Sequence, residues 1–136
     1  MKINLIVALS LFISFATVAD ETVQNKPVMI KVKMSQTCFH ISKKNKGKAK
    51  LDGWACNEKD ENQKFVFIPT NGEWFQLKST KNDLCVEVKN ANKRHHVSTA
   101  LAVCNNQDHQ LWKKNSIDDD WFTLSTKHSA GCLDLD

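Results

Sequence analysis

The sequence has only four glycines and two prolines among its 136 residues, and its one long apolar run lies within the first 19. Four scattered glycines exclude a glycine-rich phosphate-binding loop. No stretch keeps the 3.6-residue apolar period of an amphipathic helix. No later stretch is apolar over the ~20 residues that a membrane-spanning helix needs. These absences favour an all-β domain with no membrane span after residue 19.

Signals for catalysis are also missing. No histidine stands at metal-ligand spacing with a cysteine left free to bind metal, and no Ser-His-Asp motif can be located. Residues 118–120 are three aspartates, which form either a solvated turn or a paired-carboxylate site; we favour the turn. The net charge of +4 is too small to argue for nucleic acid. We therefore expect no enzyme activity, metal or cofactor. The histidines are His40, His95, His96, His109 and His128.

The N-terminus is typical of a secretory signal peptide over residues 1–19. Lys2 is its basic region, residues 5–18 are apolar, and Thr17-Val18-Ala19 is a small-residue cleavage site. The alternative is a membrane anchor, but the run is short and Asp20 follows it. Cleavage leaves 117 residues with a net charge of +3. We expect a secreted protein, extracellular or periplasmic, with a polar leader (20–27) before one domain (28–136).

A repeat of about 47 residues organises that domain. The residues 47 positions before Leu77, Cys85 and Gln110 are Ile30, Cys38 and Gln63, and those 47 positions after Trp74, Phe75, Leu77 and Cys85 are Trp121, Phe122, Leu124 and Cys132. Aromatic, apolar and cysteine positions that recur in phase indicate duplicated supersecondary units. The repeats span about 28–69, 70–115 and 116–136, and the third is incomplete.

Short apolar runs separated by Asn, Lys, Gly and Ser clusters predict strands rather than helices. The one ambiguous run, 98–103, suits a strand or a single helical turn. Three complete units would supply twelve strands, and this chain supplies ten. The predicted strands are 28–34, 38–41, 51–56, 64–68, 74–77, 84–88, 99–103, 111–112, 121–125 and 131–136.

Export makes the cysteines disulfide candidates, because disulfides persist in oxidising compartments. Each complete unit supplies its own pair, Cys38–Cys56 and Cys85–Cys104. Closing a loop of about 18 residues is worth roughly 3 kcal/mol in the chain-entropy model. Cys132 has no partner and stands where a third unit would begin its pair.

An odd number of short-stranded units, each ending in an aromatic, favours a threefold closed barrel over a sandwich. Gln63 and Gln110 each precede such an aromatic by two positions. We expect their buried amides to satisfy backbone groups in the preceding turn, while Phe65 and Trp112 fill the core.

These motifs resemble those of the ricin B-type lectin family: Cys85-Val86-Glu87-Val88, then Cys104, then Gln110-Leu111-Trp112. The first unit has Cys38, Cys56 and Gln63-Lys64-Phe65, and the third opens with Cys132-Leu133-Asp134-Leu135. The resemblance covers essentially the whole mature chain. It implies a β-trefoil with pseudo-threefold symmetry and shallow sites for galactose or N-acetylgalactosamine.

In the first unit the family pattern puts the aromatic platform at Trp54, the polar residue at Asn62 and the acidic residue at position 40, which is His40 here. Asp52 could add a polar contact. An aromatic ring stacks on the apolar face of a sugar, and a carboxylate accepts its hydroxyls. The alternatives are that Trp54 is a partly buried core residue and that His40 is an ordinary solvent-facing strand residue.

The other two units match the family pattern less well. In the second unit Glu87 takes the acidic position, but the platform position is Ala102 and His109 replaces the Asn. In the third unit only Asp134 can be assigned. No unit has the full set of site residues.

The sequence supports two functions. The leading one is a secreted carbohydrate-binding module for glycans on cell surfaces or glycoproteins. The other is a degenerate trefoil that binds protein through the incomplete third repeat or Cys132. Such a chain would be a subunit of a toxin or of another secreted complex. A further alternative is that the sequence is a fragment. A lysine-rich loop suits either an acidic surface or plain solvation, and we favour solvation. Its lysines are Lys43, Lys44, Lys46, Lys48 and Lys50.

Overall fold

A computed structural model describes residues 26–42 and 49–135. These residues form antiparallel β-structure with three single-turn 3-10 helices and no α-helix, which confirms the all-β prediction. None of the helices in the described ranges is long and apolar enough to cross a membrane. The predicted signal peptide, most of the polar leader and the lysines at 43, 44, 46 and 48 lie outside the described residues.

Eight strands and three 3-10 helices follow one another in the described chain. The strands are β1 (Cys38–Ser42), β2 (Lys50–Trp54), β3 (Phe65–Pro69), β4 (Phe75–Ser79), β5 (Cys85–Val88), β6 (Thr99–Ala102), β7 (Trp112–Ser116) and β8 (Phe122–Thr126). The 3-10 helices are η1 (Glu61–Gln63), η2 (Lys89–Ala91) and η3 (Asp108–Gln110).

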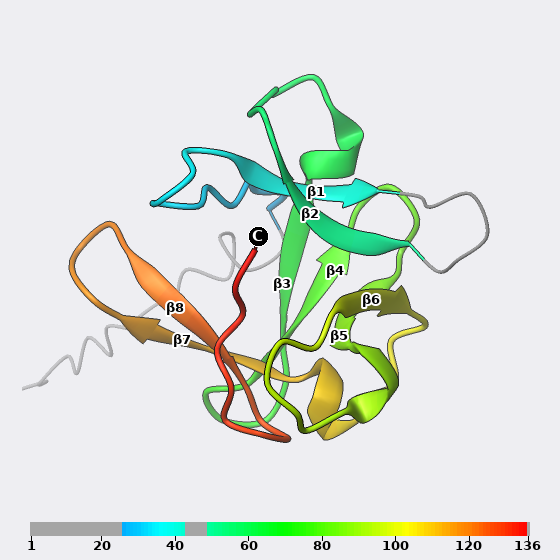
Figure 1. Ribbon diagram of the computed structural model, residues 1–136. Helices are drawn as coiled ribbons and strands as arrows, with labels where there is room; N and C mark the ends of the chain where they lie inside the picture. The colour runs from blue at the N-terminus through cyan, green and yellow to red at the C-terminus, as the bar shows by residue number, and fades with distance from the viewer. Residues whose placement is uncertain (1–25, 43–48, 136) are drawn as a thin grey trace, which may run out of the picture.

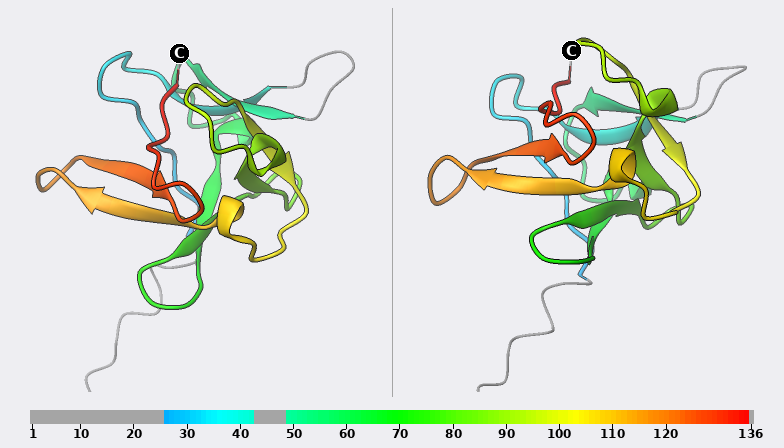
Figure 2. Two further views of the ribbon diagram at one scale, coloured as in Figure 1. Left: turned by 60° about the horizontal axis from the view of Figure 1, so that its bottom comes forward. Right: turned by 90° about the horizontal axis from the view of Figure 1, so that it is seen from below.

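The strands form two sheets, one of β1 and β2 and one of six strands (Figure 1). In the larger sheet the order is β6-β5-β4-β7-β8, with β3 also paired to β4. The β7–β8 hairpin projects away from the hairpins β1–β2 and β5–β6 in each view (Figure 2). In the strand order β8 forms one edge of the described sheet and β6 the other.

The 47-residue period is visible in the backbone pairing. Three bridges, Lys31↔Cys38, Lys78↔Cys85 and Ser125↔Cys132, are spaced by 47 residues. Each bridge encloses a tight turn in which a backbone N–H at the same position, Gln36, Asp83 or Ala130, donates to the carbonyl four residues earlier. Those three residues have φ between 55° and 57°, the left-handed conformation. The start of each unit thus folds in the same way.

The prediction of ten strands was wrong by two. Residues 28–34 make only the isolated bridges Val28↔Phe65 and Lys31↔Cys38, and residues 131–135 make only Ser125↔Cys132. Among the described residues no neighbouring strand continues either ladder, so neither segment forms a regular strand. The ambiguous run 98–103 contains strand β6.

Apolar residues from equivalent positions meet in the core. Ile30, Leu77 and Leu124 are buried and stand 47 residues apart. Phe39 and Val86, also 47 residues apart, are buried in the same cluster, and half-buried Leu133 packs against that cluster. Phe65 and Trp112 are almost completely buried, and the Trp112 indole nitrogen donates to the Val86 carbonyl at 3.0 Å. The repeat therefore builds the core.

The two glutamines have their amides buried at the end of each complete unit. Gln63 Oε1 accepts from Asn57 N at 2.9 Å, and its Nε2 donates to the Ala55 carbonyl at 2.8 Å. Gln110 makes the equivalent bonds to Asn105 N at 2.9 Å and the Val103 carbonyl at 3.0 Å. Each amide thus holds the loop that carries the second cysteine.

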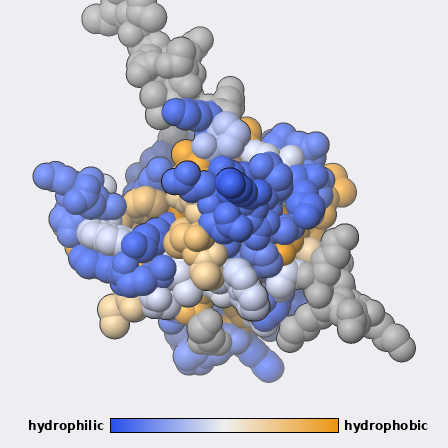
Figure 3. Space-filling model, turned by 90° about the horizontal axis from the view of Figure 1, so that it is seen from above, coloured by the Kyte–Doolittle hydropathy of each residue, from blue (hydrophilic) through white to orange (hydrophobic). Residues whose placement is uncertain are grey.

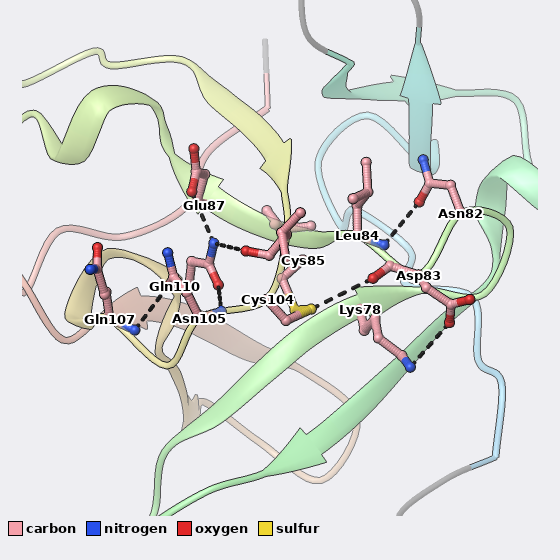
Figure 4. Close-up of a disulfide and its surroundings, with 12 residues drawn as sticks. Lys78, Asn82, Asp83, Leu84, Cys85, Glu87, Cys104, Asn105, Gln107 and Gln110 are labelled. Carbon is pink, nitrogen blue, oxygen red and sulfur yellow. Dashed lines mark hydrogen bonds and ion pairs between the residues drawn. A yellow bond between two sulfur atoms is a disulfide. The ribbon is translucent and has the colours of Figure 1, made fainter.

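Both predicted disulfides are present, Cys38–Cys56 and Cys85–Cys104. Figure 4 shows the second one beside Gln110, which bonds to the loop at Asn105. Cys132 is exposed and free.

We predict that Gln63→Leu lowers the free energy of unfolding by about 2–4 kcal/mol, because it leaves the Asn57 N–H and the Ala55 carbonyl without a hydrogen-bond partner. Urea unfolding measures the loss. Gln107→Leu, at an exposed glutamine, is the matched control and should change stability by less than about 0.5 kcal/mol. Equal effects of the two substitutions would contradict a structural role for the buried amide.

Removing either disulfide should cost about 2–5 kcal/mol. The pairs Cys38→Ala with Cys56→Ala, and Cys85→Ala with Cys104→Ala, should each lower the melting temperature, since each loop becomes free in the unfolded chain. Calorimetry under oxidising conditions measures this. Cys132→Ser, at the free thiol, should leave the melt unchanged; a comparable drop there would contradict the assignment.

Candidate functional site

The outer face of the β1–β2 hairpin carries most of the predicted site of the first unit. His40 stands opposite Asp52 in the antiparallel register, and Cys38 opposite Trp54. Because side chains alternate across a sheet, these residues share one face while Phe39, Ile41 and Leu51 enter the core. Trp54 is 63% exposed. The alternative that Trp54 is a core residue is wrong.

His40 is not an ordinary solvent-facing residue. Its side chain is 17% exposed, and its ring lies 5.7 Å from the Trp54 ring, inclined by 30°. Its Nε2 lies 3.4 Å from Asp60 Oδ2. His40 therefore links the tryptophan to a carboxylate that the sequence pattern did not identify.

That carboxylate, Asp60, caps the N-terminus of η1. Its Oδ1 accepts from Asn62 N at 2.9 Å and from Asn62 Nδ2 at 2.8 Å. The Asn62 backbone N–H is the main cause that lowers the pKa of Asp60 below its ordinary value. Burial is the second effect and raises the pKa, while the Asn62 side chain, His40 and Lys81 each lower it further. Asp60 is thus a carboxylate at neutral pH.

Lys81 completes this arrangement from the loop before β5. Its ammonium donates to Asn62 Oδ1 at 2.8 Å. We call Trp54, His40, Asp60, Asn62 and Lys81 the unit 1 site. An aspartate two residues before Asn62 is a common N-cap signal, and it could have identified Asp60. Lys81 belongs to the next unit, and no local pattern signals its approach.

Asp52 lies on the same face but is held by its neighbours. The Ser42 hydroxyl donates to Asp52 Oδ2, and the Lys50 ammonium lies 2.5 Å from Oδ1. A ligand hydroxyl at Asp52 would have to compete with these contacts. We therefore place Asp52 at the edge of the unit 1 site.

The second unit does not present its predicted acidic residue to solvent. Glu87 is 6% exposed; its Oε2 accepts from Gln110 Nε2 at 3.0 Å (Figure 4) and lies 3.2 Å from His109 Nε2. Ala102, at the platform position, supplies no ring. The carboxylate of this unit is used inside the fold.

Asp134 lies apart from the unit 1 site. It is exposed and lines a hollow of about 440 Å³ together with Trp112, Leu133 and the exposed Cys132. Basic side chains of the β5–β6 connection, including Arg94, line it as well.

The face in Figure 3 is largely hydrophilic, with apolar residues exposed in patches between hydrophilic ones.

The predicted aspartate turn at 118–120 has the geometry of a turn. Asp118 Oδ1 accepts from Trp121 N at 2.8 Å and from Asp120 N at 3.0 Å. Within the described ranges, no three His, Cys, Asp or Glu side chains come together as metal ligands could.

The comparisons with known proteins agree with this architecture. A designed threefold-symmetric protein, ThreeFoil, superimposes with a TM-score of 0.72 at 16% identity, over 78% of this chain and 76% of its own. A Polyporus squamosus lectin, solved with the epitope Neu5Aca2-6Galb1-4GlcNAc, gives 0.68 at 9% identity, over 79% of this chain and 38% of its own. An exo-β-1,3-galactanase from Clostridium thermocellum gives 0.68 at 18% identity, over 78% and 23%.

These identities establish the β-trefoil fold alone. This chain spans well under half of the lectin and of the galactanase. No curated protein matches it in sequence. The family model described as "Ricin-type beta-trefoil lectin domain-like" matches residues 15–96 and, in a second match, residues 61–136. Together these matches cover most of the sequence, and the chain therefore belongs to the ricin-type β-trefoil lectin-like family.

Proposed function

We propose that this protein binds carbohydrate through the unit 1 site. The observation that carries the proposal is Trp54, whose ring is 63% exposed beside the Asp60 carboxylate and its partners. A large exposed aromatic surrounded by polar groups is characteristic of a binding surface. A sugar would stack its apolar face on the ring and direct its hydroxyls to the polar groups.

The residues around Trp54 have complementary roles. Asp60 accepts ligand hydroxyls as a carboxylate, and the Asn62 amide and Lys81 ammonium surround it with donors. His40 lies between the two groups: its ring packs beside the Trp54 ring, and its Nε2 lies next to the Asp60 carboxylate. Asp60 takes the role that the family pattern gives to the position of His40. The site is open, so binding at it is weak, and useful avidity requires more than one site.

The ligands we propose are galactose- and N-acetylgalactosamine-type glycans. The family resemblance supports this class, and so do two structural neighbours: a lectin solved with a galactose-containing epitope and a β-1,3-galactanase. The two disulfides support an oxidising compartment. We therefore propose secretion through the peptide at residues 1–19 and a role in binding rather than catalysis.

Trp54→Ala tests this function directly. It should reduce glycan binding at the unit 1 site at least tenfold, because the stacking surface is lost, a free-energy change of about 1.4 kcal/mol or more. Saturating galactosides should raise the melting temperature of the native protein; a ligand at 100 times its Kd adds about 2.7 kcal/mol. That shift should become smaller in the variant, because the unit 1 site no longer contributes to it.

Ile117→Ala is the matched control for Trp54→Ala. Ile117 is 64% exposed, like Trp54, and lies on the β7–β8 turn. Its replacement should leave the ligand-induced shift intact. If both substitutions behave alike, or if no glycan shifts the melt of the native chain, the carbohydrate proposal fails.

The hollow of about 440 Å³ favours a second candidate function, binding of a partner polypeptide. It lies beside free Cys132 and is lined by Val88, Leu133 and Leu135. Cys132 occupies the position that Cys38 and Cys85 hold in the other units, and both of those are disulfide-bonded. A partner strand that carries a cysteine would fit here.

A synthetic peptide of residues 97–116 tests this second candidate. In the second unit this segment supplies β6, Cys104 and the whole of β7. In a buffer of reduced and oxidised glutathione, the oxidised form is reduced while Cys104 of the peptide and Cys132 of the protein form a disulfide. The melting temperature should then rise. Intact-mass spectrometry detects the adduct, and Cys132→Ser is the control. Absence of both the adduct and the shift would exclude binding of such a segment.

A further inference from the structure

A separate pocket lies between the β3–β4 turn and the segments around Asn106, Leu111 and Lys127. Its volume is about 350 Å³, and it is lined by Asn71, Trp74, Gln76, Asn106, Leu111 and Lys127, among others. This volume falls in the ~300–1,000 Å³ range of small-molecule pockets. It shares no lining residue with the unit 1 site.

The β3–β4 hairpin builds one wall of this pocket. Pro69 pairs with Phe75, and the turn between them closes where the backbone and the hydroxyl of Thr70 both donate to the Trp74 carbonyl, at 3.0 and 2.9 Å. Gly72 has φ +67°, a conformation that suits glycine. The pairing Phe75↔Trp112 brings Leu111 to the opposite wall. The turn thereby fixes Trp74 at the pocket.

Gln76 is the unusual residue of the pocket. It is 6% exposed, and its Nε2 has no hydrogen-bond partner among the described residues. Buried side-chain amides are nearly always hydrogen-bonded. In Gln63 and Gln110 both the Oε1 and the Nε2 atom have a hydrogen-bond partner. A ligand in the pocket would supply the missing partner.

The charges around the pocket favour a neutral ligand. Among the described residues that line the pocket, Lys127 alone is charged, and its ammonium lies 3.1 Å from Asp108 Oδ1. Near the Trp74 ring, Lys113 lies 5.3 Å from the ring centroid and 3.1 Å from Glu73 Oε1, so it is paired as well. Neither ammonium is left without a counter-charge.

The polar groups of the lining suit hydroxyls in particular. Gln76, Asn71 and Asn106 are amides, which both donate and accept hydrogen bonds. A hydroxyl can accept from an amide nitrogen or donate to an amide oxygen, so it fits either orientation of Gln76. The Trp74 ring offers an apolar surface for the C–H face of a sugar.

We propose that this pocket is a second ligand site, separate from the unit 1 site, which binds a neutral monosaccharide unit. It shares only its ligand class with the proposed function and needs no contribution from Trp54. Two sites on different faces of one chain allow a branched or clustered glycan to be held at both, which multiplies the apparent affinity.

The tryptophans make the two sites separately visible by NMR. The chain has four, Trp54, Trp74, Trp112 and Trp121, and each gives one indole N–H resonance. The probes are galactose, N-acetylgalactosamine and glucose, titrated into the oxidised full chain that carries Trp54→Ala. One of these sugars should shift the Trp74 indole resonance.

Gln76→Leu, added to that background, should weaken the binding about tenfold, as expected for loss of one buried hydrogen bond. The same substitution should leave the melting temperature unchanged or raise it, because it removes an unpartnered buried amide. Loss of binding together with kept stability separates a ligand-binding role from a structural one.

Asn71→Ala is a second variant on the exposed turn, where folding is not at risk, and it should weaken the same titration. Asn82→Ala, in a turn outside the pocket lining, is its matched control and should not. The proposal is overturned if no neutral sugar shifts Trp74, or if Gln76→Leu leaves the titration unchanged. If the native chain binds sugar at Trp74 but not at Trp54, the result would contradict the proposed unit 1 site and support the pocket at Trp74.

Discussion

The rest of the structure depends on the buried glutamine amide that ends each complete unit. Gln63 and Gln110 bind the loop that carries the second cysteine, directly before the aromatic that enters the core. Short strands supply few ladder hydrogen bonds, so such loops need side-chain partners. With the loop held, the disulfide and the core aromatic are both positioned, and the outer face of the hairpin can change without disturbing the barrel.

Much of this fold could be predicted from sequence because it repeats. Residues that recur every 47 positions predicted the units, the two disulfides and the shared core positions of Ile30, Leu77 and Leu124. Segments 28–34 and 131–135 were overpredicted as strands, since apolar composition does not reveal whether a neighbour is there to pair with. Burial and pairing are tertiary properties, and local patterns specify them only indirectly.

The candidate site was less predictable for the same reason. Trp54 and Asn62 follow a fixed spacing, but Asp60 reaches the site from a 3-10 turn and Lys81 from another unit. Glu87 has the right residue type and spacing, yet it pairs inside the fold with His109. Both complete units contain an imidazole–carboxylate contact, but the strand residue is a histidine on β1 and a glutamate on β5. Its partner comes from a different position in each unit, Asp60 before η1 and His109 within η3. The groups that remain for a ligand therefore differ between the two units.

The short reach of the disulfides bears on how the chain oxidises. They join cysteines 18 and 19 residues apart. A cross-unit pairing of Cys56 with Cys85 would close a loop of 29 residues, and the entropy difference is only about 0.4 kcal/mol. Chain statistics alone therefore give little protection against scrambling, and free Cys132 adds a competitor thiol. The repeated tight turns at Gln36 and Asp83 lie just before the first cysteine of each pair and are closed by contacts close in sequence. We therefore expect correct oxidation to depend on these local turns forming before the covalent bonds close.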